Sequence, residues 1–220
     1  MSTATRLGLY NAALALLKER ELSALTDSVE TRRVLDNVWN RGRGIVHACL
    51  EQGLWNFATR TSSFDTSASI TVSFGFPYGF EQPSDFVRLV GIASDEFFTH
   101  PLSDAEFTDE AGNWYANSTP IYVRYVSNGT SYGNNLSLWP ESFTRYVECY
   151  LAVEAAPRLT KSKELTDDLY KLIKNRLLDA KSKDAMNEGT GILPEGSWNR
   201  ARRGGRSSWR DRGYRHTLIG

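Results

Sequence analysis

The stretch Leu54-Trp55-Asn56-Phe57-Ala58-Thr59-Arg60 joins a long segment with helical periodicity to a segment with the character of a β-strand. It places two large aromatic side chains, Trp55 and Phe57, within three positions, so both faces of the chain must be covered there. Such a concentration of aromatic surface is unusual at the end of a helix. We therefore interpret the stretch as architectural and assign Trp55 and Phe57 to a hinge between helices and sheet.

Two helices are predicted before this hinge. Apolar residues at steps of three and four predict the first helix over about residues 5–21. Asp27 and Glu30 have the spacing of a capping box, which predicts that a second helix begins near Ser28. Gly53 suits the C-terminal end of that second helix.

Gly42 and Gly44 fall inside the predicted second helix. A glycine in a helix interior costs roughly 1 kcal/mol relative to alanine. Either another backbone approaches closely at this point, or the helix kinks. The first reading makes Gly42 and Gly44 a candidate contact between helices of adjacent subunits.

Residues 60–138 have the composition of β-structure, because Ser, Thr, Gly, Asn and aromatic residues dominate. Apolar residues alternate in 70–74 and 121–126, which predicts strands there. Residues 86–92 fit either a strand or a single helical turn. The prolines and alternating aromatics of residues 76–89 are typical of a half-buried edge strand. Together these signals predict one small antiparallel sheet inserted between helices.

Helix resumes at Trp139-Pro140-Glu141, where the proline and the acidic residue suit a first helical turn. Pro157 is expected to kink or end this helix, and a last helix is expected from about Ser162 to Glu188. The predicted fold is α+β, mainly α: a four-helix body with an inserted small antiparallel β-sheet and an extended C-terminal arm. The predicted parts are an N-terminal helical pair (1–59), the β insertion (60–138), a C-terminal helical pair that completes the body (139–188) and a basic aromatic arm (189–220).

The 220 residues are 40% hydrophobic and 24% charged, as is ordinary for a soluble globular protein. No apolar run approaches the length of about 18 residues that a membrane span requires, and the N-terminus lacks a convincing signal-peptide cleavage site. We therefore expect synthesis in the cytoplasm and no membrane partner. The two cysteines, Cys49 and Cys149, are expected to be reduced and buried.

Charge is distributed unevenly along the chain. Residues 189–220 hold seven arginines against two acidic residues, a net +5. Residues 1–188 hold 19 basic and 24 acidic residues, a net −5. The asymmetry favours a basic tail that docks on another molecule while the body stays mildly acidic.

The sequence contains no motif for covalent chemistry. The three histidines, His47, His100 and His216, lie far apart and form no zinc-binding pattern. The phosphate-loop, dinucleotide-binding and nucleophile-elbow patterns are also absent. We therefore predict no catalytic residue, no cofactor and no metal site, and expect that the protein is not an enzyme.

One acidic cluster lies in the β insertion and comprises Asp104, Glu106, Asp109 and Glu110. A solvated loop is the simplest interpretation of such a cluster. A bound cation or a pair of carboxylates acting in catalysis are the alternatives.

The basic arm interleaves arginine with aromatic residues. Arginine forms forked contacts with carboxylates and phosphates, and Trp and Tyr are typical interface anchors. The arm could bind nucleic acid by phosphate neutralisation and base stacking, or order on a protein surface. A disordered solubilising tail is a third reading, which two tryptophans suit poorly. The candidate contact residues are Trp198, Arg200, Arg202, Arg203, Arg206, Trp209, Arg210, Arg212 and Tyr214.

The order of these signals is similar to that of a known family. A helix with Tyr10-Asn11-Ala12-Ala13 precedes the stretch 54–60, and the β insertion contains Tyr78-Gly79-Phe80-Glu81-Gln82-Pro83-Ser84-Asp85-Phe86-Val87-Arg88. Gly196-Ser197-Trp198-Asn199-Arg200-Ala201-Arg202 follows the last two predicted helices. Over roughly residues 5–202 the chain resembles the head-to-tail adaptor proteins of tailed bacteriophages, the tail tubular protein A-like group.

The resemblance implies a ring of about twelve copies between the portal and the tail nozzle or tube. It implies that the helical body forms the ring and lines the DNA conduit, through which genomic DNA passes without sequence-specific binding. The β insertion is then expected to face outward or toward tail components, and the C-terminal segment to reach onto the portal. The expected location is the neck of the virion, after assembly in the host cytoplasm.

A structural head-to-tail adaptor whose arm docks on the portal is thus the leading hypothesis. The first alternative is a DNA-binding virion protein that uses its basic arm. The second is a virion-associated cell-wall hydrolase, which requires two carboxylates at a suitable separation, drawn from Asp104, Glu106 and Asp109.

Overall fold

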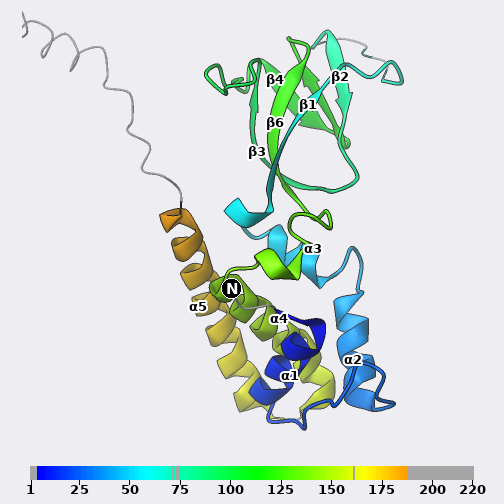
Figure 1. Ribbon diagram of the computed structural model, residues 1–220, viewed down its shortest axis with the longest axis vertical. Coiled ribbons are helices and arrows are strands. Elements are labelled where there is room, and N and C mark those ends of the chain that lie inside the picture. Colours follow the sequence, from blue (N-terminus) through cyan, green and yellow to red (C-terminus); the bar gives the residue numbers. More distant parts are fainter. Residues whose placement is uncertain (1–3, 71, 73–74, 161, 188–220) are drawn as a thin grey trace, which may run out of the picture. The chain divides into compact units, whose positions relative to one another are not determined.

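The structure, a computed structural model, describes residues 4–70, 72, 75–160 and 162–187. These residues form five α-helices and two small antiparallel sheets (Figure 1). Helices on both sides of a β insertion are therefore confirmed, whereas the expected four helices and single sheet are wrong. The predicted arm, 189–220, lies outside the described residues. The helices are α1 (Arg6–Leu16), α2 (Glu30–Trp39), α3 (Ile45–Leu50), α4 (Glu141–Leu159) and α5 (Lys163–Met186).

The first helix is shorter than predicted and ends at Leu16 rather than near residue 21. Asn11 explains the early end, because its side chain binds both backbone groups of Leu22. Its Nδ2 donates to the Leu22 carbonyl at 3.0 Å, and its Oδ1 accepts from the Leu22 amide at 2.9 Å. The chain turns back after α1 at Lys18, which has a φ of 59°.

The second helix begins at Glu30, two residues after the predicted start near Ser28. The predicted capping box does not form, because Asp27 serves the turn before the helix instead. Its Oδ2 accepts from the amides of Ser23 at 2.8 Å and Ala24 at 3.0 Å.

Two helices, α2 and α3, replace the single helix predicted up to Gly53. The chain breaks between Trp39 and Ile45, where Gly42 has a φ of 60° and Gly44 a φ of 93°. A helix cannot continue through residues with positive φ. The prediction that these glycines lie inside a helix is therefore wrong, and their shared feature is a backbone conformation that favours glycine.

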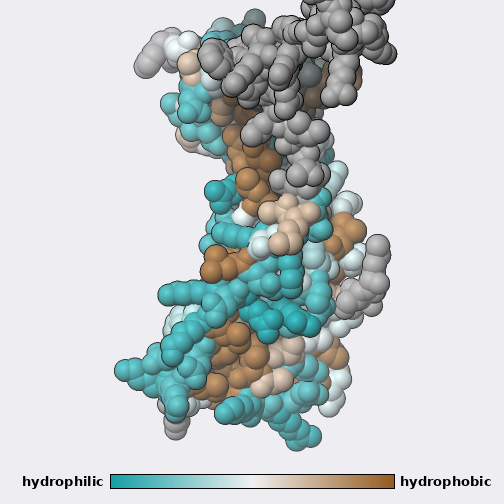
Figure 2. Space-filling view, turned by 90° about the vertical axis from the view of Figure 1, so that its left-hand side faces the viewer, coloured by the Kyte–Doolittle hydropathy of each residue, from teal (hydrophilic) through white to brown (hydrophobic). Residues whose placement is uncertain are grey.

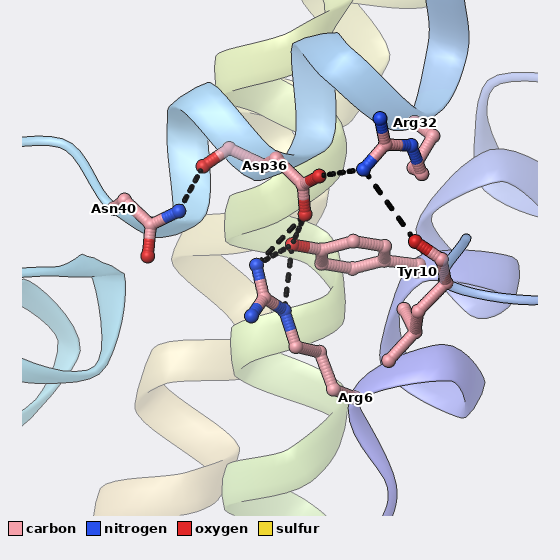
Figure 3. A network of polar contacts seen from close by, with 6 residues as sticks. Arg6, Tyr10, Arg32, Asp36 and Asn40 are labelled. Atoms are coloured by element: carbon pink, nitrogen blue, oxygen red, sulfur yellow. Dashed lines mark hydrogen bonds and ion pairs between the residues drawn. The ribbon is translucent and has the colours of Figure 1, made fainter. Parts of the chain in front are cut away.

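Asp36 ties α1 to α2 through a polar network (Figure 3). Its Oδ1 accepts hydrogen bonds from Arg6 at 2.8 Å and from the Tyr10 hydroxyl at 2.9 Å. Its Oδ2 accepts from Arg32 at 2.8 Å, and Asn40 donates to its backbone carbonyl at the end of α2. Burial raises the pKa of Tyr10, so the phenol remains a donor at neutral pH. The network fixes α1 against α2.

Helix α4 is the centre of the helical part and contacts α1, α2, α3 and α5. Pro157 was expected to kink or end this helix, which ends two residues later at Leu159. Pro157 lacks the amide that would bond to the carbonyl of Val153, but this is a single bond in the last turn. The final helix, α5, agrees with prediction, and Ser162 caps it by accepting from the amide of Leu165.

The six strands form two three-stranded antiparallel sheets, with orders β1-β6-β3 and β2-β5-β4. The strand predicted at 121–126 is confirmed, and the segment 86–92 proves to be a strand. Ile70 and Val72 lie in no strand, while the rest of the strand predicted at 70–74 lies outside the described residues. The strands are β1 (Thr59–Phe64), β2 (Tyr78–Glu81), β3 (Phe86–Ala93), β4 (Phe107–Glu110), β5 (Asn113–Ala116) and β6 (Ile121–Ser127).

The edge strand predicted over residues 76–89 is in fact two edge strands, β2 and the start of β3, each in a different sheet. The two sheets share a small core around Trp114 of β5. Its ring lies 5.4 Å from that of Phe64 in β1 and 5.3 Å from that of Phe86 in β3. Each small sheet thus buries one face against the other.

The helices before and after the β insertion share a second, larger hydrophobic core. Trp55 and Trp139 belong to this core, as does Val126 at the end of β6. Arg88 of β3 also donates to the carbonyl of Glu51, just after α3, at 3.1 Å. The insertion is therefore joined to the helical part by side-chain contacts as well as by the two connecting chains.

Candidate docking surfaces

None of the nine predicted arm residues lies within the described part of the chain. The structure therefore does not place Trp198, Arg200, Arg202, Arg203, Arg206, Trp209, Arg210, Arg212 or Tyr214. Their role as contact residues stays a prediction.

The acidic charge of residues 1–188 belongs to the β insertion. Residues 60–138 hold three arginines against nine Asp and Glu residues, a net −6, whereas the helical segments 1–59 and 139–188 together carry +1. The expected mildly acidic body is thus a nearly neutral set of helices with a strongly acidic insertion. A charged protein surface favours partners of opposite sign and repels like-charged ones.

The turn between β3 and β4 is built around the carboxylate of Asp95. Its Oδ2 accepts from the Thr99 hydroxyl at 2.6 Å and the Thr99 amide at 2.9 Å, and its Oδ1 accepts from the His100 amide at 2.8 Å. These bonds, led by that of the Thr99 hydroxyl, lower the pKa of Asp95 to about 2. Asp95 is therefore ionised at neutral pH, and its carboxylate accepts three hydrogen bonds within the turn.

This turn presents a large aromatic side chain to solvent. Phe97 is 77% exposed, and the adjacent Phe98 adopts a φ of 57°, a conformation that a bulky residue rarely adopts. The guanidinium of Arg124 lies 4.1 Å from the centre of the Phe98 ring and covers it. A preorganised turn with an exposed aromatic residue has the properties of an interface anchor. The sequence offers no signal for it beyond two phenylalanines among polar residues.

Helix α5 presents apolar side chains away from the core. Of its 24 residues only Leu169, Ala180 and Asp184 are buried, and it packs chiefly along α4. Leu178 is 67% exposed and Met186 is 78% exposed. Figure 2 shows hydrophobic residues gathered over the helices on the side where α5 lies in Figure 1. This side of α5 is a second candidate surface for contact with a protein.

Trp55 and Phe57 lie between α3 and β1, where the hinge was predicted. Trp55 is 1% exposed, and its Nε1 donates to the Leu50 carbonyl at 3.1 Å. Its ring lies 4.8 Å from that of Phe143 in α4, and the ring of Phe57 lies 4.8 Å from the same side chain. Phe57 is only partly buried. The two residues therefore anchor the junction on α4.

Asp85, within the motif of residues 78–88, organises the base of the insertion. Its carboxylate accepts from Arg60 at 2.9 Å, from the Tyr125 hydroxyl at 3.2 Å and from the Ser127 hydroxyl. Partial burial disfavours its ionisation, but the hydrogen bonds from Ser127 and Arg60 and the charge of Arg60 outweigh it and lower the pKa. Asp85 thereby links β1 and β6 to the start of β3.

Gly42 and Gly44 show no close approach of another backbone within the described residues. Nothing lies within 4 Å of a Cβ placed at Gly42, and the Trp39 carbonyl is 3.5 Å from one placed at Gly44. Their predicted contact with another subunit stays a prediction, but as a contact made by a loop rather than by a helix.

Two carboxylates of the acidic cluster, those of Glu106 and Asp109, accept hydrogen bonds from neighbouring residues. Glu106 accepts from the amide and hydroxyl of Ser103, which lower its pKa, whereas a general acid needs a raised one. Asp109 accepts from Gln82, and its neighbour Glu110 points to the other face of the strand. Within the described ranges no three His, Cys, Asp or Glu residues are grouped so as to hold a metal ion.

Three further candidate groups for chemistry, Cys49, Cys149 and His47, are buried side chains. Cys49 and Cys149 are both free and buried, as predicted. His47 is 3% exposed and lies 3.1 Å from Glu51, and burial lowers its pKa. No helix of the described residues is long and apolar enough to cross a membrane.

Comparison with models of known protein families and with curated proteins finds no match for this sequence.

Proposed function

We propose that this protein is a structural virion component, a head-to-tail adaptor of a tailed bacteriophage that joins the portal to the tail nozzle or tube. About twelve copies form a ring around the DNA conduit. The mainly helical body forms that ring, and the basic aromatic arm, 189–220, docks on the portal. The protein acts by binding other proteins and carries out no chemical reaction.

The single observation that carries this proposal is the Asp95 turn. It holds Phe97 in solvent on a β unit whose core is separate from that of the helices. A surface turn needs neither a strained Phe98 nor an exposed Phe97 in order to fold, so the arrangement favours a role in binding. The resemblance in motif order and the composition of the arm support the same role.

The distribution of charge is consistent with a division of labour among three parts. Helices with a net +1 have little electrostatic attraction for DNA that must slide past them. An insertion of −6 is repelled by DNA, which favours a position away from the conduit. The arm, at +5, is the part suited to a negatively charged surface.

Deletion of residues 196–220 tests the proposal. The truncated protein should keep the thermal unfolding of the full chain, because the described core ends before this segment. It should also fail to join DNA-filled heads to tails in an assembly reaction. Normal joining by the truncated protein would refute the portal-docking role of the arm.

The same pair of proteins separates the adaptor from a DNA-binding virion protein. In a gel-shift assay with random duplex DNA at physiological salt, the adaptor proposal predicts weak binding by both forms. Tight binding by the full chain that is lost on truncation would favour the DNA-binding alternative.

A further inference from the structure

We propose that Asn56 and Asp184 form a clasp that fixes where the C-terminal segment leaves α5, relative to the start of the β insertion. The two are positioning residues, and their role in docking rests on the adaptor function proposed above. The clasp itself can be tested without any partner.

The clasp consists of two reciprocal hydrogen bonds between residues 128 positions apart. The Asn56 amide donates to Asp184 Oδ2 at 3.0 Å, and Asn56 Nδ2 donates to the Asp184 carbonyl at 3.0 Å. Each side chain therefore binds a backbone group of the other residue. Asp184 is 5% exposed, so its carboxylate is largely withdrawn from water.

Each bond serves a backbone group at the end of a helix. Asn56 is the first residue of a short 3₁₀ helix (Asn56–Ala58), and its amide has no partner within that helix. The carbonyl of Asp184 lies in the last turn of α5, where helices commonly fray. At the 3₁₀ helix the clasp thus supplies the partner of the Asn56 amide, whereas at the end of α5 it adds a second bond to the Asp184 carbonyl, which also accepts from the Asn187 amide at 3.0 Å.

The clasp lies close to the starting points of both adjoining parts. Three residues after Asn56, the chain enters β1 at Thr59. Three residues after Asp184, α5 has ended at Asn187, beyond which the C-terminal segment begins. The clasp is therefore three residues away from the start of β1 and three residues away from Asn187, after which the C-terminal segment follows.

Asn56 follows directly on a residue that is firmly packed in the helical core. Its neighbour Trp55 is buried, bonded to the Leu50 carbonyl and packed against Phe143 of α4. The last turn of α5 lacks such support from apolar packing, since Met186 is 78% exposed. The polar clasp therefore supplies the attachment that hydrophobic packing does not supply at this end of α5.

Such an attachment matters for a protein that must engage partners through two parts at once. Fixing the origins of the β insertion and the C-terminal segment lowers the entropy lost when both dock. A frayed end of α5 would let the segment start from many positions. The adaptor would still fold, but simultaneous engagement would become less favourable.

Distance measurement between spin labels on the free, full-length protein tests the clasp. Labels are introduced at Met186→Cys on α5 and Ser63→Cys on β1, both exposed positions. The native Cys49 and Cys149 are buried and should resist labelling. The distance distribution is then compared among Asn56→Ala, Asp184→Ala, Asp184→Asn and Asp179→Asn.

The clasp predicts one narrow distribution in the parent protein and a broadened one in Asn56→Ala and Asp184→Ala. Asp184→Asn keeps an oxygen acceptor and the same backbone carbonyl, so it should retain the narrow distribution. Asp179→Asn removes only the exposed Asp179–Lys183 pair of α5 and is the matched control. An unchanged distribution in Asn56→Ala would overturn the proposal, and it remains decisive if Asp184→Ala fails to fold, because Asn56 itself is exposed.

Capture by purified portal protein then relates the clasp to function. Asn56→Ala should be captured less well than the parent, while Asp184→Asn should be captured normally. Capture of Asn56→Ala equal to the parent, despite a broadened distribution, would overturn the docking role. Failure of the parent itself to bind portal would instead refute the adaptor function and leave the distance result standing.

Discussion

The helical part and the β insertion are stabilised in different ways. The helices share one core of large apolar and aromatic side chains around α4, and their segments carry a net charge of only +1. The insertion has a smaller core around Trp114, a net charge of −6, and carboxylates that hold its turns and its base. Apolar packing is therefore more extensive in the first region, which also contains the Asp36 network, whereas hydrogen-bonded carboxylates organise the turns and the base of the second. This contrast predicts different responses to substitution and to pH.

The largest effect is expected from truncating the aromatic support of the helical core. Trp55→Ala should lower the free energy of unfolding by about 3–5 kcal/mol, since the side chain is fully buried and its indole is hydrogen-bonded. Phe57→Ala should have a smaller effect because Phe57 is partly exposed. Urea unfolding of both variants measures the difference. Equal losses would show that Phe57 is as deeply packed as Trp55.

The next effect concerns the base of the insertion. Asp85→Ala removes the common acceptor of Arg60, Tyr125 and Ser127, and should destabilise the insertion by about 2–3 kcal/mol. Asp109→Ala is the matched control, because Asp109 is exposed and has one partner, Gln82. It should change stability by less than about 0.5 kcal/mol. Hydrogen exchange should show a loss of amide protection in β6. An equal loss of amide protection in α4 would contradict the proposed difference between the two regions.

Lowering the pH should destabilise the β insertion before it destabilises the helical part. The pKa of Asp85 is lowered in the folded state, so the unfolded chain binds a proton first as pH falls. Its contribution is complete above the usual Asp pKa and is lost as pH falls through the lowered value. Amide exchange followed from pH 6 to pH 2 should show the insertion opening before the helices. In Asp85→Asn that loss should be smaller, and an unchanged acid response would exclude Asp85 as the cause.

A smaller effect is expected in the loop between α2 and α3. Gly44 has a φ of 93°, so Gly44→Ala should cost about 1–2 kcal/mol through backbone strain. Gly91→Ala in β3 is the control, because its φ is not positive and nothing lies within 4 Å of an added Cβ. Thermal unfolding compares them. If Gly44→Ala were neutral, the break would need a cause other than backbone conformation.

The smallest effect on stability is expected at the tip of the insertion. Phe97→Ala should change the free energy of unfolding by less than about 0.5 kcal/mol, because the ring is 77% exposed. The same substitution should impair joining of heads to tails if the turn is an interface anchor. Normal joining would remove the turn from the docking surface.

The general order of helices and strands follows from local sequence patterns. Predictions from such patterns were correct where a segment carried one clear pattern. The strand predicted at 121–126 and the start of the last helix predicted near Ser162 are examples. Predictions failed where a side chain had two possible partners. Asp27 bonds to the preceding turn and not to its own helix, and Asn11 binds the returning chain at Leu22.

The candidate surfaces were harder to predict because they depend on contacts between distant residues. Asn56 lay in the most conspicuous stretch of the sequence, but its partner Asp184 is 128 positions away, and nothing local indicates the pair. The exposure of Phe97 depends on the Asp95 bonds and on the cover that Arg124 gives to Phe98. The arm was predicted from the composition of residues 189–220, which lie outside the described part of the chain.

Electron microscopy of the purified full-length protein, alone and mixed with purified portal protein, tests the adaptor function most directly. The account predicts rings of this protein seated on the portal, and no such rings when residues 196–220 are deleted. A full-length protein that never associates with the portal, or a truncated one that associates equally well, would contradict it.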